Sequence, residues 1–363
     1  MNRFSKVLIA LVALAIVGSV VFAQVGVVLP TKDEPRWIQD QTRFEAAFKA
    51  AGINSQVLFS QGNTATEKTN VESLISQGIK VLVICPQDGA GAAAAAEEAH
   101  KAGIKVISYD RLIMGTDAVD YYVTFDSSAV GAAWGKFLVA KAGSTKKNNL
   151  YLYAGAASDN NAFIFFQGAW SVLQPKIADG TFVIMNSSEA VKLQKKATLT
   201  RDETAKIIGQ VTTNWNFADA KNKAEANLTA AKKADKGTVY IEAPNDGTAR
   251  AIADAFAADK DVKKYFITGQ DAEIASIQYI IDGKQTMTVL KDVRTLVADA
   301  IAAATAFAKG QTPPSDNIKS VLNYTGKTYV PCKPSAIVTV TKENVKAAII
   351  DSGYYTADKF SGL

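Results

Sequence analysis

The residues of this sequence that could do chemistry are polar and charged side chains that follow short apolar runs. Each apolar run predicts a buried strand, and ligands of open parallel sheets bind beyond the carboxyl ends of the strands. The side chains expected at these ends are acidic, basic or amide groups: Lys32, Arg36, Asp88, Asp110, Arg111, Asp159, Asn160, Asn161, Asn245, Asp246, Gln270, Asp271, Lys291 and Asp292. The aromatic residue Trp37 stands beside Arg36.

This set of groups suits an uncharged ligand that carries many hydroxyls. Carboxylates and amides pair with adjacent hydroxyls, arginine donates hydrogen bonds as a planar fork, and an aromatic face covers the C–H side of a sugar ring. A phosphate fits less well, because the sequence has no glycine-rich phosphate cradle. The alternative is that each Asp or Asn only caps a helix or ends a turn, as these residue types often do.

Histidine and cysteine are too scarce for most metal and nucleophilic sites. The sequence has one histidine, His100, and two cysteines, Cys85 and Cys332. A zinc site needs three or four such ligands close together, so we expect neither a metal nor another cofactor. His100 lies in an alanine-rich stretch and is predicted to be a helix-surface residue. The cysteines are predicted to be free, partly buried thiols, with a disulfide as the open alternative.

One glycine pattern allows a different function. Gly89-Ala-Gly91-Ala-Ala-Ala94 fits G-x-G-x-x-A, and Asp110 ends the next predicted strand, as in a dinucleotide-binding fingerprint. That fingerprint normally occupies the first strand–helix turn, whereas this pattern follows the third strand. We therefore favour a polar turn before an alanine-rich helix. An exported dinucleotide-dependent oxidoreductase that uses the Gly89–Ala94 turn remains the alternative.

The elements that must position these residues alternate between strands and helices. Strands are predicted at 24–29, 55–59, 80–85, 104–109, 150–153, 182–185, 238–242, 265–268 and 286–290. Helices are predicted at 37–51, 69–77, 89–102, 163–177, 202–215, 246–258, 272–282 and 293–309. This order predicts an α/β protein of two doubly wound parallel-sheet halves, with the break near 124–127.

Length and charge fit this division. The chain has 363 residues, enough for two domains. Its formal net charge of +5 is spread along the sequence without a long Lys/Arg run, which argues against nucleic acid as a partner. Residues 1–23 have a basic start, an apolar run and small residues before Gln24. They predict a signal peptide cleaved near Ala23–Gln24 and hence export of the chain; the periplasm as the destination is what the family resemblance given below implies.

Several motifs give the sequence a resemblance to a known family. They are Pro30-Thr-Lys-Asp-Glu-Pro-Arg36-Trp37, the Asp110-Arg111 pair after the fourth strand, Asp159-Asn-Asn-Ala-Phe163, Gly269-Gln-Asp-Ala272 and Lys291-Asp292. The sequence resembles type I periplasmic monosaccharide-binding proteins of ABC transporters, of the pentose/hexose group. The D-xylose-binding proteins and their multiple-sugar-binding relatives are the most similar. The stretch 198–202 departs from the family pattern, because it stands where some relatives carry a tryptophan.

The resemblance implies a fold and a domain division. Two α/β lobes would be joined by three crossover strands. The N-terminal lobe would contain residues 24–125 plus 291–318, and the C-terminal lobe residues 126–290 plus 319–363.

The resemblance also implies a function without catalysis. The chain would capture one aldose, xylose or a similar pentose or hexose, between the lobes and deliver it to a membrane ABC permease. A monomer is expected, and a chemoreceptor or sensor as a second partner stays open. The sugar-binding residues carried over by position are Arg36, Asp110, Arg111, Asn160, Asn161, Asn245, Asp271 and Lys291. Second-rank contacts are Lys32, Trp37 and Phe163.

Overall fold

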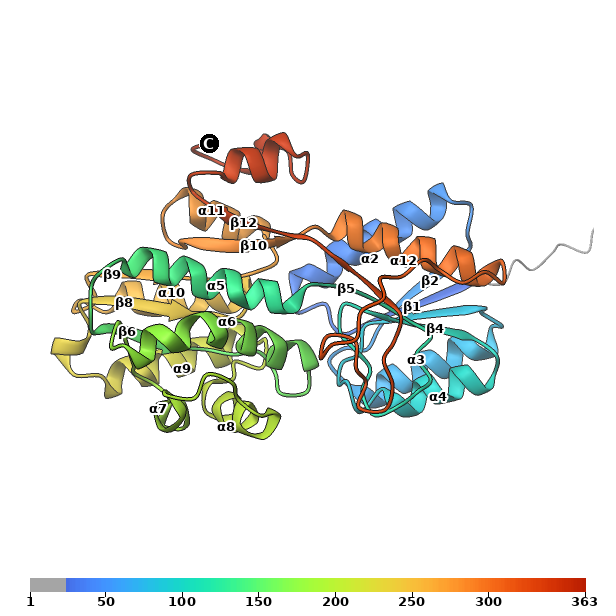
Figure 1. Cartoon of the computed structure of the whole chain (residues 1–363). Coiled ribbons are helices and arrows are strands. Elements are labelled where there is room, and N and C mark those ends of the chain that lie inside the picture. Colours follow the sequence, from blue (N-terminus) through green and yellow to red (C-terminus); the bar gives the residue numbers. More distant parts are fainter. Residues whose placement is uncertain (1–23) are drawn as a thin grey trace, which may run out of the picture.

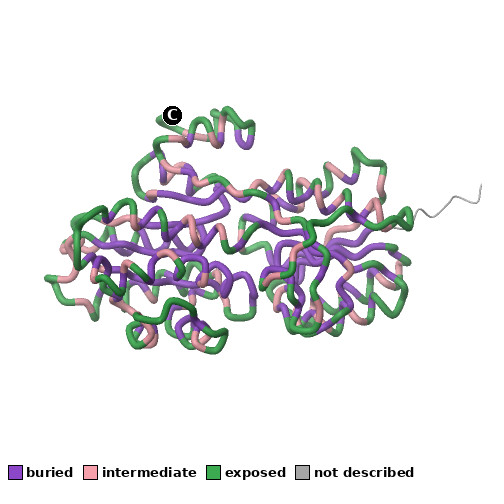
Figure 2. The backbone as a smooth tube through the Cα atoms, viewed as in Figure 1, coloured by how far each residue is buried: buried purple, intermediate pink, exposed green. Residues whose placement is uncertain are grey.

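A computed structural model describes residues 24–363, so the predicted signal peptide lies outside the described residues. Figure 1 shows two α/β lobes side by side, each built on its own sheet. The sheets are buried between helices, as the purple strands in Figure 2 show.

The N-terminal lobe holds a six-stranded sheet in the order β11-β5-β4-β3-β1-β2, and all of its strand pairs are parallel. Its strands are β1 (Val25–Leu29), β2 (Ser55–Phe59), β3 (Val81–Ile84), β4 (Lys105–Tyr109), β5 (Tyr121–Phe125) and β11 (Cys332–Ser335). The central strands are continuous apolar runs because helices cover both faces. One face packs on α2 (Pro35–Ala50) and α12 (Val293–Ala308), and the other on α3 (Thr64–Ser76) and α4 (Ala93–Lys101).

The C-terminal lobe holds a four-stranded parallel sheet in the order β7-β6-β8-β9. Its strands are β6 (Asn148–Leu152), β7 (Phe182–Ile184), β8 (Thr238–Glu242) and β9 (Lys264–Ile267). One face packs on α5 (Ser127–Ala142) and α6 (Asn160–Ala178), with α7 (Ser188–Leu193) and α8 (Arg201–Val211) at the edge of the same core. The other face packs on α9 (Phe217–Ala230) and α10 (Asp246–Ala258).

A small antiparallel pair completes this lobe. It consists of β10 (Met287–Lys291) and β12 (Ile337–Thr341), which share a core with α11 (Ile274–Ile281) and the C-terminal segment. Three single turns of other helical types occur at Lys233–Asp235, Lys346–Asp351 and Ala357–Lys359. The predicted strand at 286–290 thus exists, but its strand partner is antiparallel.

The chain crosses between the lobes after β5, after β10 and after β11. At the first two crossings a helix starts at once, with Asp126 and Asp292 as side-chain caps. The third crossing corrects the expected boundary at 318/319. Because β11 pairs with β5, and Leu322 and Val330 join the core beside α3 and α4, residues 319–335 lie with the N-terminal lobe. The other boundaries stay a prediction.

The helices α5 and α6 pack closely at glycines. A Cβ on Gly131 would lie 1.8 Å from the Phe165 carbonyl oxygen, and one on Gly168 would lie 2.3 Å from that of Ser128. Only glycine allows backbones to approach so closely. This close packing fixes α6, whose first turn carries Asn160 and Asn161, against α5, which is the first helix after the chain passes between the lobes.

Two smaller predictions are confirmed. Cys85 and Cys332 are free and buried, and His100 is exposed on α4. Among residues 24–363, no helix has the length and apolar character needed to cross a membrane.

Candidate ligand-binding site

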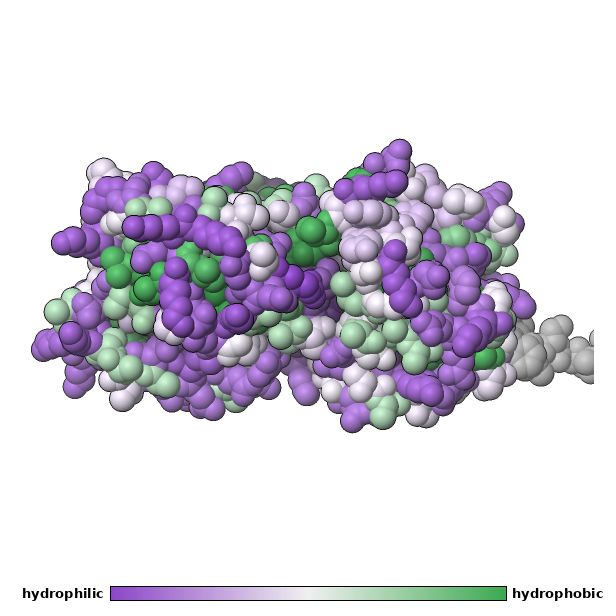
Figure 3. Space-filling view, turned by 60° about the horizontal axis from the view of Figure 1, so that its bottom comes forward, coloured by the Kyte–Doolittle hydropathy of each residue, from purple (hydrophilic) through white to green (hydrophobic). Residues whose placement is uncertain are grey.

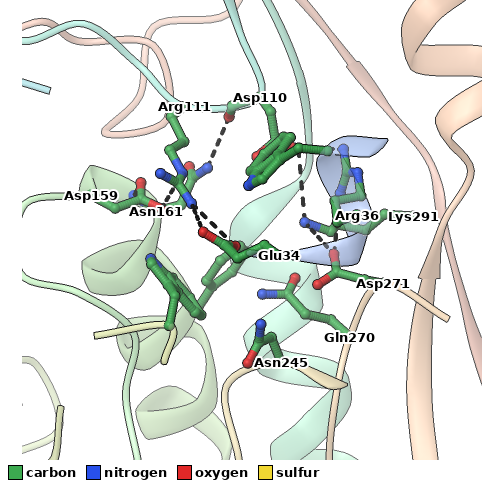
Figure 4. Close-up of a pocket in the computed structure, with 13 residues that line it drawn as sticks. Glu34, Arg36, Asp110, Arg111, Asp159, Asn161, Asn245, Gln270, Asp271 and Lys291 are labelled. Carbon is green, nitrogen blue, oxygen red and sulfur yellow. Dashed lines mark hydrogen bonds and ion pairs between the residues drawn. The ribbon is translucent and has the colours of Figure 1, made fainter. Parts of the chain in front are cut away.

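The candidate site is a cavity between the two lobes. It spans about 290 Å³ of space that is partly open to solvent. It is lined from both sides by Glu34, Arg36, Trp37, Asp110, Arg111, Asp159, Asn161, Phe165, Trp215, Asn245, Gln270, Asp271 and Lys291. Figure 4 shows these side chains converging from loops and helix starts of both lobes. In the space-filling view of Figure 3 the hollow at the junction of the lobes is hydrophilic, and a hydrophobic patch lies beside it.

Arg36 is the centre of an ion-pair cluster. Its guanidinium binds Asp40 at 2.7 Å, Asp110 at 2.8 Å and Asp271 at 3.1 Å, and its side chain is 3% exposed. Asp40 lies one turn further along α2, so helix geometry alone brings it to Arg36. Asp271 belongs to the other lobe, so this arginine joins the lobes across the cavity.

Lys291 adds a second positive charge beside the same two carboxylates. Its Nζ lies 3.0 Å from Asp271 Oδ1 and 3.8 Å from Asp110 Oδ2. Burial raises the pKa of Asp110, but the charges of Lys291, Arg36 and Arg111 outweigh burial and leave that pKa below its ordinary value. Asp110 is therefore an ionised acceptor, suited to a pair of hydroxyl donors.

Arg111 joins the lobes at a second point. Its Nε lies 3.2 Å from Asp159 Oδ2 of the C-terminal lobe, and its Nη2 lies 3.3 Å from Glu34 Oε1 of its own lobe. Burial raises the pKa of both carboxyls, and Arg111 opposes that rise. Each of the two arginines thus pairs with carboxylates from both lobes.

Both acidic residues expected at the sugar have a strained backbone. Asp110 has a φ of 59° and Asp271 a φ of 99°, a region that residues other than glycine rarely adopt. Such strain persists only where the surroundings enforce it, and it is concentrated at functional sites. The positive φ values turn the chain after β4 and after β9, so that the carboxylates of Asp110 and Asp271 lie beside Lys291.

The apolar part of the lining is aromatic. It comes from Trp37 on one lobe and from Phe165 and Trp215 on the other. Trp215 was predicted to lie in a helix over 202–215, and this is wrong, because α8 ends at Val211. Asn214 and Trp215 then take φ values of 52° and 59°, which turn the indole toward the cavity.

Gly155 makes room for that indole. A Cβ on Gly155 would lie 2.0 Å from Trp215 Cζ2, so any larger residue would displace the ring.

Three buried polar atoms of the lining have no hydrogen-bond partner within the described residues. They are the donors Trp37 Nε1 and Trp215 Nε1 and the acceptor Gln270 Oε1. Buried polar atoms are almost always bonded, so all three are available to a ligand that can accept and donate. A hydroxyl does both.

The structure brings most of the predicted sugar-binding residues together, namely Arg36, Asp110, Arg111, Asn161, Asn245, Asp271 and Lys291, with Trp37. Two of the amides are already engaged. Asn161 donates to the Asp110 carbonyl at 2.8 Å, and Asn245 Oδ1 caps α10. Each of these two amides therefore has fewer free hydrogen-bonding groups for a ligand than the sequence predicts.

Three predicted contacts do not line the cavity. Asn160 accepts a hydrogen bond of 2.7 Å from Arg201, whose guanidinium also covers the Phe163 ring at 4.1 Å. Lys32 is exposed, with its Nζ 4.9 Å from the centre of the Phe59 ring.

Five lining residues were not assigned to the ligand. Asp159 and Gln270 were placed at strand ends only, Trp215 was placed only in a predicted helix, and Glu34 and Phe165 were not singled out. Glu34 precedes Pro35, which starts α2, so an acidic residue there resembles an ordinary helix start. Phe165 lies in an apolar run and resembles core.

The geometry argues against the dinucleotide alternative. The Gly89 N–H donates to the Ser158 carbonyl at 2.9 Å, and the Gly91 N–H donates to Asp88 at 2.7 Å. These are the groups that would have to hold a pyrophosphate. Asp110, which would bind a ribose, is instead paired with Arg36.

Comparisons with known proteins agree with the site. A family model described as a periplasmic binding protein domain matches residues 25–312. The chain is 32% identical to the multiple sugar-binding periplasmic receptor ChvE of Rhizobium radiobacter, over 98% of this chain and 99% of that protein. It is 31% identical to the D-xylose-binding periplasmic protein of Escherichia coli, over 92% and 91%.

Among solved structures, a carbohydrate transporter solute-binding protein from Chloroflexus aurantiacus in complex with D-glucose is 69% identical, with a TM-score of 0.91 over 94% of this chain and 98% of that one. An ABC transporter solute-binding protein from Clostridium phytofermentans with bound β-D-glucose is 34% identical, with a TM-score of 0.80 over 92% and 99%. The expected fold class and family resemblance are confirmed, and nothing in these comparisons supports an oxidoreductase.

Proposed function

The chain belongs to the periplasmic binding protein family, among its sugar-binding members, and we propose that its own ligand is D-glucose or a closely similar neutral aldose. The observation that carries the proposal is the cavity between the lobes, where carboxylates, arginines and indoles converge. The glucose bound to the 69% identical protein supports a hexose in particular.

The chemistry of the lining explains how such a ligand would be held. Asp110 and Asp271 accept hydrogen bonds from adjacent hydroxyls, while Arg36 and Lys291 donate to hydroxyl and ring oxygens. The Trp37 and Trp215 rings offer apolar faces to the C–H groups of the sugar. Trp215 Nε1 and Gln270 Oε1 gain the partners they lack within the protein.

Binding and lobe closure would be one process. The sugar contacts both lobes at once, so it stabilises the arrangement in which they are close, by rotation about the three crossings. The arginines then keep their interlobe ion pairs and add the ligand to them. A ligand that touched one lobe only would gain no such preference.

The cellular setting of the proposal follows from the family. We propose delivery of the sugar to an ABC permease, action as a monomer without enzymatic activity, and export directed by residues 1–23. The relatives named as periplasmic support the location. A sensor or chemoreceptor as a further partner is compatible with this function, but no feature of the site depends on it.

A panel of sugars tests the proposed ligand. The protein is first freed of carried-over sugar by unfolding and refolding, and its thermal unfolding is then followed with D-glucose, D-xylose, D-galactose, L-arabinose and D-ribose. A ligand at about 1,000 times its Kd stabilises by roughly 4 kcal/mol, which is a clear shift in Tm.

The outcomes separate the alternatives. The largest shift is expected with D-glucose. A shift with D-xylose alone would move the assignment to a pentose, and shifts with several aldoses would indicate broad capture. Stabilisation by none of them would overturn the monosaccharide assignment.

A further inference from the structure

The positive charges in the cavity are already neutralised by the protein. Arg36 uses its Nε, Nη1 and Nη2 on Asp40, Asp271 and Asp110, respectively. Lys291 lies against the same Asp271 and Asp110. An anionic ligand would therefore find these two cations engaged.

Arg111 would be available to an anion if Glu34 were not there. Its Nε pairs with Asp159 at 3.2 Å and its Nη1 reaches the Pro86 carbonyl at 3.5 Å. The remaining Nη2 is taken by Glu34 at 3.3 Å. Figure 4 shows the Glu34 carboxylate among the lining residues, directed at this guanidinium.

Glu34 also tips the balance of charge. The cavity lining holds the carboxylates Glu34, Asp110, Asp159 and Asp271 against the cations Arg36, Arg111 and Lys291. Without Glu34 the charges of the lining residues are equal in number, and with it the lining has a surplus negative charge. Buried Asp40, which binds Arg36 from outside the lining, adds a further negative charge to the site. Like charges in a buried site repel strongly, because little water screens them.

Glu34 is held in place from its own lobe. It is the residue before Pro35 at the start of α2, its carbonyl accepts from the Trp37 N–H at 3.1 Å, and its side chain is 19% exposed. The carboxylate is thus fixed at the rim of the cavity, although its backbone belongs to no regular element.

We propose that Glu34 is a specificity-determining residue that restricts the site to neutral aldoses and rejects sugar acids, by occupying Arg111 and by keeping a surplus negative charge in the cavity. This rests on the proposed function, since it concerns the choice among sugars at the same site. A hexuronate differs from its hexose only by a carboxylate at C6, so the pair isolates the effect of charge.

The experiment measures Kd for D-glucose and for D-glucuronate in the parent, Glu34→Gln, Glu34→Asp and Glu45→Gln. Glu45 is an exposed carboxylate on the same helix, so its replacement changes the net charge equally away from the cavity. Titrations are done at pH 8, because burial raises the pKa of Glu34 and the ionised form is required. Thermal unfolding of each variant verifies that it is folded.

The readout is the ratio of the glucuronate Kd to the glucose Kd. We expect this ratio to fall at least tenfold in Glu34→Gln and to stay near the parent value in Glu34→Asp and Glu45→Gln. An unchanged ratio in folded Glu34→Gln, or equal binding of both ligands by the parent, overturns the role of Glu34. Should Glu34→Gln not fold, Glu34→Ser takes its place under the same criterion. A parent that binds neither ligand contradicts the proposed function instead.

Discussion

At the scale of single residues, the site is a set of charges that hold one another in place. Arg36 binds three carboxylates, two of which also meet Lys291. Tyr109 donates a hydrogen bond to Asp40 from beneath, so the guanidinium is fixed before any ligand arrives. Groups fixed in advance lose little freedom on binding, which favours affinity.

Removal of either acidic partner should abolish most binding. In Asp110→Ala and Asp271→Ala a sugar hydroxyl and a buried cation each lose a carboxylate acceptor, which costs about 2–5 kcal/mol, or roughly 30-fold to several thousandfold in Kd. Both variants should still fold, since Arg36 keeps two other carboxylates. Glucose titration and thermal unfolding measure this, with exposed Asp351→Ala as control. Parent-like titrations would remove these residues from the site.

The position of Trp215 depends on the absence of a side chain at residue 155. In Gly155→Ala the added methyl would overlap the indole, so the ring must leave the cavity wall. We expect Kd for D-glucose to rise about tenfold to a hundredfold, the loss of roughly 1.4–2.8 kcal/mol of contact energy. Gly209→Ala is the matched control, because a Cβ there meets nothing. Equal affinities in the two variants would contradict a role for the indole.

At the scale of elements, ligands of parallel sheets bind beyond the carboxyl ends of the strands, and this strand-end rule explains which site residues the sequence could predict. Parallel strands end at one edge, so Asp110, Asn245 and Asp271 were found without knowledge of the fold. The rule has no means of finding Trp215, whose placement depends on where α8 stops. The signal was local: asparagines, which tolerate positive φ, flank this tryptophan at 214 and 216.

The C-terminal segment was harder to predict for a different reason. The strand β11 reads Cys-Lys-Pro-Ser and lacks an apolar run, because it is an edge strand of the six-stranded sheet. A proline is tolerated there since no further strand needs its N–H. Composition therefore could not assign residues 319–335 to a lobe, and only the pairing with β5 does so.

The close packing of α5 and α6 at their glycines leads to a prediction about stability. Gly168→Ala would place a Cβ 2.3 Å from the Ser128 carbonyl oxygen and push the helices apart. Overpacking of this kind destabilises by about 1–3 kcal/mol, which urea unfolding detects. Gly247→Ala, in open space near the start of α10, serves as control. Unchanged stability of Gly168→Ala would mean that the close crossing is not required.

At the scale of the whole molecule, the ion pairs and the crossings act together. Arg36–Asp271 and Arg111–Asp159 join the lobes across the cavity, while the crossings after β5, β10 and β11 join them through the backbone. In the closure proposed above, the crossings would form the hinge and the ion pairs would fix the register in which the lobes meet. A neutral sugar placed between the charges adds contacts to this closed arrangement without upsetting its charge balance.

A buried carboxyl behind the cavity makes the stability of the whole chain depend on pH. Glu242, at the end of β8, is 1% exposed and lies among the aromatic side chains of Trp134, Phe165 and Phe166. Burial raises the pKa of Glu242 to about 8. Between its ordinary value near 4.5 and about 8, the folded chain holds a proton that the unfolded chain has released.

The free energy of unfolding must fall as pH rises through that window, because folding takes up a proton there and the proton concentration decreases. Glu242→Gln removes this dependence, since a neutral amide has no proton to hold. The variant should therefore become progressively more stable relative to the parent from pH 5 to pH 8, by roughly 3–4 kcal/mol over that range.

Urea unfolding at half-unit steps of pH measures the difference, with exposed Glu225→Gln as control for the change in charge. Glu67, whose pKa burial raises to about 7, adds a similar slope up to that pH in parent and variant alike, so it cancels in the comparison. Asp110 acts in the opposite sense, because its pKa is lowered in the folded chain. Its ionised form stabilises the fold at any pH above its ordinary pKa, and this stabilisation is lost only as the pH falls into the acid range. A constant difference between Glu242→Gln and the parent across this range would show that Glu242 is not the group that titrates.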